Sequence, residues 1–344
     1  MSAIKVGIVA IIVGAIGTVA ILVTPSWFPV AAAVQAHRQD DLYLALMIMS
    51  SFIMAVVTVF LVYSVWRWRA SPDDLRDGPP IHGNTTLEII WTVVPTIIVI
   101  AFAVAGGVVL VKNEQTTNQE LVVNVTGEQF AWTFEYNEGG RRFTTAQLYL
   151  PAGESVKFQV QSKDVIHDFW VPDFRLKIDA VPGITTSYRV TPKTSAVGPH
   201  QIVCAELCGL GHAFMRQTAH VMTKPQFAAW VQRTSRAAGG GGGGQAGAAP
   251  DAKALFTNGS SATGATACGA CHTLQAAGTS GTTGPDLDQV LKGKDPAFIK
   301  QSILQPDAQI APGFSKGIMP PNYRSTLKPA EVDAIVKFLS DSTK

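Results

Sequence analysis

The sequence predicts a multi-domain membrane protein, with N-terminal transmembrane helices, then a β sandwich with Greek-key connections, then a separate C-terminal domain. Three observations predict this order. Three apolar runs precede residue 112, short β-rich segments fill residues 120–224, and six consecutive glycines follow at 239–244. A chain of 344 residues is long enough for two or three domains.

The apolar runs cover residues 4–23, 42–66 and 89–111. Each is about as long as the ~20 residues that a helix needs to cross the hydrocarbon core of a bilayer. The first run contains Lys5 and fits either a cleaved secretory signal or a retained membrane helix. We favour the retained helix.

Basic residues predict how these helices are oriented. The loop between the second and third runs carries Arg67, Arg69 and Arg76, whereas the loop before it has only Arg38. Because loops rich in Lys and Arg stay in the cytoplasm, everything after residue 111 is predicted to be extracytoplasmic. A net charge of +2 gives no reason to expect a nucleic-acid partner.

Residues 120–224 alternate short β-rich segments with turn residues. Several such strands over about 100 residues favour a sandwich with Greek-key connections. The predicted strands are 121–125, 130–136, 155–160, 185–190 and 218–222, and the predicted turns are 151–153, 181–183 and 198–199.

A stretch between two of these strands concentrates metal-binding side chains. It supplies two thiols, an imidazole and a thioether in twelve residues, from Cys204, Cys208, His212 and Met215. Such soft ligands suit copper or zinc. Structural zinc sites are built from Cys and His ligands and do not use methionine. Met215 therefore favours copper and electron transfer over zinc. The other alternative is a pair of buried core cysteines beside an incidental histidine. A further ligand is expected from elsewhere, and the candidates are His37, His82, His167, His200 and His220. Of these, His167 lies in a predicted loop, 165–172, between strands.

The C-terminal part carries a second cysteine pair, in Cys268-Gly-Ala-Cys271-His272. This is the attachment pattern of a c-type haem, in which two thiols bond the vinyl groups and the histidine ligates iron. Met319 is the only methionine of residues 251–344 and is the expected second axial ligand. A redox dithiol or half of a zinc site is the alternative. The glycine-rich stretch 237–250, which follows a predicted helix at 226–236, is predicted to be a flexible linker.

The chain resembles subunit II of cytochrome c oxidase, and its C-terminal part resembles a class I cytochrome c. The first resemblance covers roughly residues 40–225 and is carried by the segments 88–95, 127–136, 165–171, 176–183 and 204–215. It implies a cupredoxin-like sandwich that holds the dinuclear copper centre CuA. The second implies an all-α domain, with helices at 254, 296–304 and 329–340, in which the Pro285 carbonyl accepts a hydrogen bond from His272.

The first resemblance also implies roles for individual residues. Cys204 and Cys208 would bridge the two coppers, and the terminal ligands would be His167, Met215, His212 and the backbone carbonyl of Glu206. The Glu206 side chain would bind Mg²⁺ at the boundary with subunit I. Glu88 would stand at the entrance of a proton pathway, or else be an ordinary carboxylate at a helix N-terminus.

Two aromatic positions concern electron entry. The family keeps Trp at the position of Trp132, but this chain has Phe130 where the family usually has the tryptophan associated with electron entry from a separate cytochrome c. The usual docking route is therefore in doubt. The attached haem domain offers an explanation, because it is itself a source of electrons.

Together these features predict an electron-entry subunit of a cytochrome c oxidase in a bacterial plasma membrane. A cytochrome c, another small carrier or a quinol-oxidising complex would reduce haem c, and electrons would pass through CuA to haem in subunit I. There, oxygen is reduced to water with proton translocation. Alternatives are a subunit of a nitric oxide reductase and a membrane-tethered carrier without an oxidase. The predicted parts are 1–41, the hairpin 42–119, the CuA domain 120–236, the linker 237–250 and the cytochrome c domain 251–344.

Overall fold

The computed structural model describes residues 3–24, 27–69, 78, 80, 82–116, 120–138, 140–240, 251–259, 265–321 and 323–344. Arg76, used above for the orientation of the helices, and residues 241–250 of the predicted linker lie outside this set. The chain forms two compact units, one of residues 1–30 and 36–114 and the other of residues 31–35 and 115–344.

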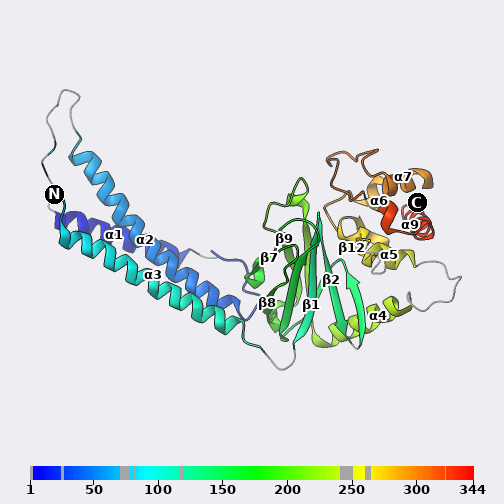
Figure 1. Cartoon of the computed structure of the whole chain (residues 1–344), viewed down its shortest axis with the longest axis horizontal. Helices are drawn as coiled ribbons and strands as arrows, with labels where there is room; N and C mark the ends of the chain where they lie inside the picture. The colour runs from blue at the N-terminus through cyan, green and yellow to red at the C-terminus, as the bar shows by residue number, and fades with distance from the viewer. Residues whose placement is uncertain are drawn as a thin grey trace. The chain divides into compact units, whose positions relative to one another are not determined.

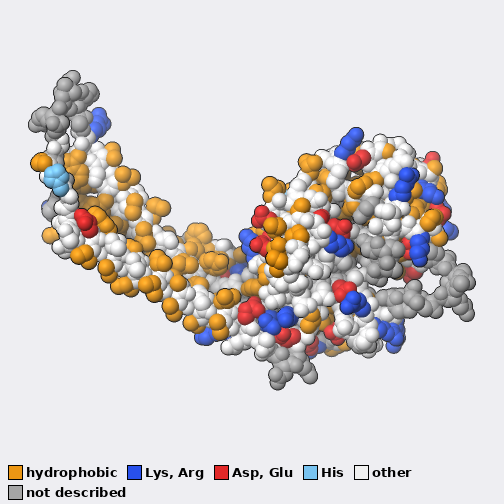
Figure 2. All heavy atoms as spheres, viewed as in Figure 1, with side chains coloured by type: hydrophobic (Ala, Val, Ile, Leu, Met, Phe, Trp, Pro, Cys, Tyr) orange, Lys and Arg blue, Asp and Glu red, His pale blue; other side chains and the backbone are white. Residues whose placement is uncertain are grey.

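The first unit is helical. It contains α1 (Ala3–Val23), α2 (Ala36–Arg67) and α3 (Thr85–Asn113), and hydrophobic side chains cover the visible face of these helices (Figures 1 and 2). Among the described residues these three helices are long and apolar enough to cross a membrane, with mean hydropathies of 2.8, 2.6 and 2.6. The three predicted spans are therefore confirmed as helices, and α2 and α3 extend into polar residues at both ends.

Small residues let α1 approach α2 closely. A methyl group added at Gly14 would collide with the Phe52 ring, and one at Gly17 would collide with the Ser51 hydroxyl. Close approach of backbones at glycine is how helices associate where lipid removes the hydrophobic driving force between them. The two glycines therefore allow α1 to pack closely against α2.

The second unit begins with a sandwich of two five-stranded sheets (Figure 1). One sheet has the order β3-β2-β1-β5-β8 and the other β4-β10-β9-β6-β7. The pairs β1–β5 and β4–β10 are parallel, and all other pairs are antiparallel. The strands are β1 (Leu121–Glu128), β2 (Ala131–Glu138), β3 (Arg141–Thr145), β4 (Leu148–Pro151), β5 (Val156–Ser162), β6 (His167–Val171), β7 (Leu176–Ala180), β8 (Thr186–Val190), β9 (Gly198–Cys204) and β10 (Arg216–Met222).

The core lies between these sheets. Side chains alternate between buried and partly exposed along β1 and β5, as expected when one face of each strand packs inward. The largest fully buried side chains of the sandwich are Trp132, Phe134, Tyr136, Phe158, Phe169 and Phe174. Five strands were predicted, and all five are confirmed with boundary shifts as β1, β2, β5, β8 and β10.

Two predictions in this region are wrong. Residues 165–172 were expected to form a loop, but β6 begins at His167. Gly198-Pro199 was expected to be a turn, but it starts β9. Both segments become strands because of their neighbours: β6 pairs with β7 and β9, and Pro199 faces His220 of β10. Local turn residues do not reveal such pairing.

Helix α4 (Lys224–Gly240) continues four residues beyond the predicted end at 236. The extension includes Ala237 and Ala238, which have high helix propensity. The helix packs on the sandwich through Trp230, whose ring lies 4.4 Å from that of Tyr149 and 5.2 Å from that of Tyr136.

The C-terminal domain is helical apart from a two-stranded ladder. Its helices are α5 (Ala252–Asn258), α6 (Leu287–Val290), α7 (Pro296–Leu304), α8 (Tyr323–Thr326) and α9 (Pro329–Ser342), and its strands are β11 (Thr273–Leu274) and β12 (Thr279–Ser280). The helices predicted at 254, 296–304 and 329–340 are confirmed. Their buried faces form one core around Phe256, Ile299, Ile335 and Leu339.

Candidate copper and haem sites

The predicted copper ligands converge at one end of the sandwich. Cys204 ends β9, His212 lies in the 3₁₀ turn His212–Phe214, and Met215 directly precedes β10. His167 begins β6. These elements are neighbours because β9 pairs with both β6 and β10. Sheet pairing therefore brings together residues that are up to 48 positions apart in the chain.

The donor atoms lie within a few ångströms of one another. The two thiol sulfurs of Cys204 and Cys208 are 3.9 Å apart, and Cys208 Sγ is 3.9 Å from Met215 Sδ and 3.7 Å from His212 Nδ1. Cys204 Sγ is 4.0 Å from His167 Nδ1 and 3.2 Å from the Glu206 carbonyl. Because two thiolates, two imidazoles and a thioether suit copper, the donor set fits the implied centre.

The other candidate histidines are not part of this cluster. Both ring nitrogens of His200 are engaged elsewhere, Nδ1 with Asp173 Oδ2 at 2.7 Å and Nε2 with the Ala196 carbonyl at 2.8 Å. His220 stacks on Tyr149, with ring centroids 5.0 Å apart. His37 and His82 belong to the helical unit.

Asp164 supports the His167 ring, a role that the sequence did not reveal. Its Oδ1 lies 2.8 Å from His167 Nε2, and its two oxygens accept the backbone N–H groups of Gln129 and Val165 at 2.7 Å each. With Asp164 on Nε2, the other ring nitrogen, Nδ1, faces Cys204 Sγ and is the one placed to bind a metal. The available signal was a carboxylate three positions before the histidine.

The pKa values of the two thiols are shifted in opposite directions. The hydrogen bond from Cys208, together with those from His167 and backbone groups, lowers the pKa of Cys204 to about 3 despite burial. The same sulfur contact and burial raise the pKa of Cys208. Burial lowers the pKa of His167, but hydrogen bonds with Cys204 and Asp164 outweigh it and raise the pKa above its usual value. Without metal, the pair therefore holds one thiolate and one thiol.

Copper binding by the metal-free chain should strengthen as pH rises. Cys204 is already ionised at neutral pH, but Cys208 must lose its proton to bind metal, so affinity should rise about tenfold per pH unit. Because the raised pKa of His167 adds a second proton at lower pH, the slope should steepen below neutrality. Competition titrations with a copper chelator between pH 6 and 8 measure this slope.

The variant Met215→Leu is the matched control, because a thioether carries no proton. It should bind copper more weakly but keep the same pH slope. A pH-independent affinity of the parent chain would contradict the assignment of Cys208 as a ligand.

Two aromatic side chains border the copper cluster. Trp132 is fully buried, and its ring meets those of His167 and Phe169 edge-on, at 5.8 and 5.3 Å. Phe130 is 5% exposed and lies under the ligand loop, where a methyl group added at Gly211 would collide with its ring. Phe130 is therefore covered by this chain's own backbone.

The haem-attachment residues line an apolar cavity of about 450 Å³. Cys268, Cys271, His272 and Met319 all border it. His272 Nδ1 lies 2.9 Å from the Pro285 carbonyl, and Gly284 is so close to the ring that an added methyl group would collide with it. The imidazole is thus held with Nε2 available to iron, and the residues present fit a c-type haem.

Burial sets the protonation of this second site. It lowers the pKa of His272, partly offset by the bond to Pro285, so the imidazole is neutral and able to ligate. It raises the pKa of both Cys268 and Cys271 to about 12, so both thiols are protonated before attachment.

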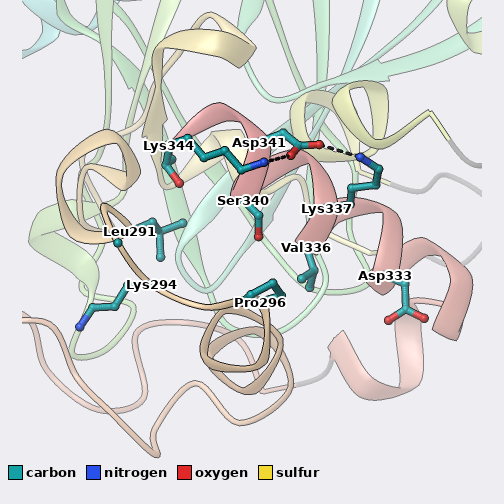
Figure 3. A pocket seen from close by; sticks show the side chains of 11 residues that line it. Leu291, Lys294, Pro296, Asp333, Val336, Lys337, Ser340, Asp341 and Lys344 are labelled. Atoms are coloured by element: carbon teal, nitrogen blue, oxygen red, sulfur yellow. Dashed lines mark hydrogen bonds and ion pairs between the residues drawn. The ribbon is translucent and has the colours of Figure 1, made fainter.

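A separate hollow of about 570 Å³ lies on the same domain (Figure 3). None of the four haem-attachment or axial residues lines it. At its rim, Asp341 pairs with both Lys337 and Lys344 at 2.7 Å. We assign it no part in the redox chemistry.

The two glutamates singled out from the sequence occupy different settings. Glu88 lies in the first turn of α3, where its Oε1 accepts from the Asn84 N–H at 3.1 Å while Asn84 Oδ1 accepts from the Leu87 N–H at 3.1 Å. These two bonds cap the N-terminus of α3, which is the alternative role for that carboxylate. Glu206 turns its carbonyl toward Cys204 and is exposed.

The fold and the two sites define a membrane-anchored electron-transfer protein. Three family models match in order: cytochrome c oxidase subunit II, transmembrane domain, at residues 21–106; cytochrome c oxidase subunit II, periplasmic domain, at 141–221; and cytochrome c at 238–343. The chain belongs to the cytochrome c oxidase subunit II family and carries a cytochrome c domain at its C-terminal end.

Two curated proteins and one solved structure are similar to this chain. Cytochrome c oxidase subunit 2 of Synechocystis is 32% identical over 59% of this chain and 74% of its own length. Heme-copper oxidase subunit 2 of Aeropyrum pernix is 33% identical over 50% of this chain and 79% of its own length. A crystal structure of the periplasmic domain of subunit II from Bradyrhizobium japonicum is 28% identical and covers 36% of this chain and 97% of that domain, with a TM-score of 0.33.

Membership of this family confirms several of the predictions. The protein is a subunit of a haem–copper oxidase, an oxidoreductase complex, which implies subunit I and other oxidase subunits as partners. It is a membrane protein with an extracytoplasmic domain. The two families imply that it binds CuA copper and haem c.

Proposed function

We propose that this subunit accepts electrons at its own haem c and passes them through CuA to haem in subunit I. The observation that carries the proposal is the convergence of the two thiols with His167, His212 and Met215 in one cluster. Copper held by these soft ligands would supply one-electron redox chemistry at this end of the sandwich. Strands on either side of the cluster hold the ligands rigidly, which electron transfer favours.

The chain's own residues would bind the copper and orient its ligands. The two coppers would be held by the thiols of Cys204 and Cys208, by His167 and Met215, and by His212 with the Glu206 carbonyl. Asp164 fixes the orientation of His167 by accepting from Nε2. Removing such a supporting group costs about 10–100-fold in metal affinity in other sites.

At the haem site, Cys268 and Cys271 would attach the macrocycle, and His272, oriented by the Pro285 carbonyl, would ligate iron. Met319 would provide the second protein ligand. A Met/His pair raises the reduction potential, which suits an acceptor of electrons from a respiratory donor. The donor is a cytochrome c, another small carrier or a quinol-oxidising complex, and the membrane is a bacterial plasma membrane.

Two carboxylates extend the proposal to the oxidase partner. The exposed side chain of Glu206 would bind Mg²⁺ at the boundary with subunit I. Glu88 would admit protons at the cytoplasmic end of α3, in addition to capping that helix. Neither side chain is needed for the electron path itself.

Purification from the native membrane tests the proposed function. The full chain, extracted in mild detergent, should bring with it a larger subunit that contains haem and consumes oxygen when haem c is reduced. Isolation of this chain alone would favour the tethered carrier, and a partner that reduces nitric oxide instead would favour the reductase. Either result would overturn the proposal.

A further inference from the structure

The C-terminal domain contacts the sandwich through a face of small side chains, here called the alanine face. Ala131 and Ala146 of the sandwich form one buried cluster with Ala267 and Ala270, and Cys271 packs against it. The four alanines are at most 6% exposed. Because alanine loses no rotamer freedom on burial, such a contact forms at little entropic cost and brings the two backbones close.

Hydrogen bonds surround this apolar centre. The Thr266 hydroxyl donates to Glu128 Oε2 at 3.4 Å, and the Thr144 hydroxyl donates to the Asn258 carbonyl at 3.4 Å. The Thr283 hydroxyl donates to the Phe214 carbonyl. An apolar core inside a polar rim is the anatomy of a specific protein interface.

Thr283 is placed between the two candidate metal sites. It is 1% exposed, and its acceptor Phe214 directly precedes the copper ligand Met215. On the haem side, Thr283 is followed by Gly284 and Pro285, whose carbonyl accepts from His272 Nδ1 at 2.9 Å. Two hydrogen bonds and one short backbone segment therefore join the iron-ligating histidine to the copper-ligand loop.

We propose that the alanine face is the docking surface from which the haem domain reduces CuA, and that Thr283 is the positioning residue that holds it there. This inference rests on the proposed function. One electron leaves the reduced haem and enters the copper pair, and no proton moves and no bond is made or broken. While the face is occupied, Ala131, the neighbour of Phe130, is closed to any external protein. An external donor then reaches haem c and not CuA.

The first test compares Thr283→Val, which removes the hydroxyl, with Thr283→Ser, which retains it. In the purified oxidase, electrons photo-injected into haem c should reach CuA several-fold more slowly in Thr283→Val, up to about tenfold, because a lost hydrogen bond weakens docking by that factor. Thr283→Ser should restore the rate. Both metal spectra should be retained in the two variants, because Thr283 borders the haem cavity but supplies no ligand atom to either metal.

Thr257→Val is the matched control. The Thr257 hydroxyl donates to the Lys253 and Ala254 carbonyls, so its hydrogen bonds stay within α5. Its loss should leave the transfer rate at the parent value. An equal slowing in Thr257→Val and Thr283→Val would show a general effect on the domain and overturn the positioning role.

The second test measures docking of the haem domain on the sandwich independently of electron transfer. Ala146→Gln places a long side chain in the alanine face, whereas Ala276→Gln adds the same side chain at an exposed position of the haem domain. Hydrogen exchange at residues 212–216 and 281–285 should accelerate in Ala146→Gln and Thr283→Val, and not in Ala276→Gln. If hydrogen exchange and electron transfer are both unchanged in Ala146→Gln and in Thr283→Val, the inference is overturned.

Failure of the proposed function can be distinguished from failure of the docking proposal. If the parent oxidase shows no transfer from haem c to CuA, the proposed function fails whatever the exchange data show. If the parent transfers electrons but the variants at 146 and 283 behave as the parent does, the function stands and the alanine face is not the docking surface.

Discussion

Replacing Cys208 by serine should abolish the near-infrared copper band and leave the haem c spectrum intact. Cys208 Sγ lies within 4 Å of Cys204 Sγ, Met215 Sδ and His212 Nδ1, so it has the most central position in the cluster. A serine hydroxyl is a hard ligand and does not bridge copper as a thiolate does. We expect essentially complete loss of the dinuclear centre, measured by optical and electron paramagnetic resonance spectra of the purified chain.

Cys268→Ser is the reciprocal control. It changes the same residue type in the other cysteine pair, so it should disturb haem attachment and preserve the copper band. A copper band that survives Cys208→Ser would refute the bridging assignment. Loss of both spectra in either variant would indicate misfolding instead of ligand loss.

Replacing Met319 by alanine should lower the reduction potential of haem c and open its sixth coordination position. Axial ligands set haem potentials over a range of ~0.8 V, and a thioether favours the reduced state. Met319 borders the cavity together with Cys268, Cys271 and His272. Redox titration and binding of carbon monoxide to the reduced haem would measure the two effects.

Ile318→Ala is the control for packing. Ile318 is 8% exposed and lines the same cavity but has no ligand atom. Its truncation should loosen the pocket and leave the sixth position closed. An unchanged potential in Met319→Ala, or carbon monoxide binding by both variants, would mean that another residue ligates iron.

Patterns local in sequence predicted much of the architecture. The spans now seen as α1, α2 and α3 were evident because ~20 consecutive apolar residues suit a bilayer and little else. The attachment pattern at Cys268–His272 was evident because the covalent chemistry of haem requires that spacing. Strands β3, β4, β6, β7 and β9 were not predicted. At the start of β6 and of β9, neither His167-Asp168 nor Gly198-Pro199 carries the alternation or composition that identifies a strand.

The sequence by itself determined the order of the domains, the two cysteine pairs and the kind of metal that each pair suits. Only the tertiary structure decided which side chains surround them. It selected His167 over His200, supplied Asp164 as its support and brought Ala131, Ala146 and Thr283 to one interface. The physical reason is that ligand spacing within a loop is a local property. Strand pairing and domain packing bring together residues far apart in the chain, and no local pattern records them.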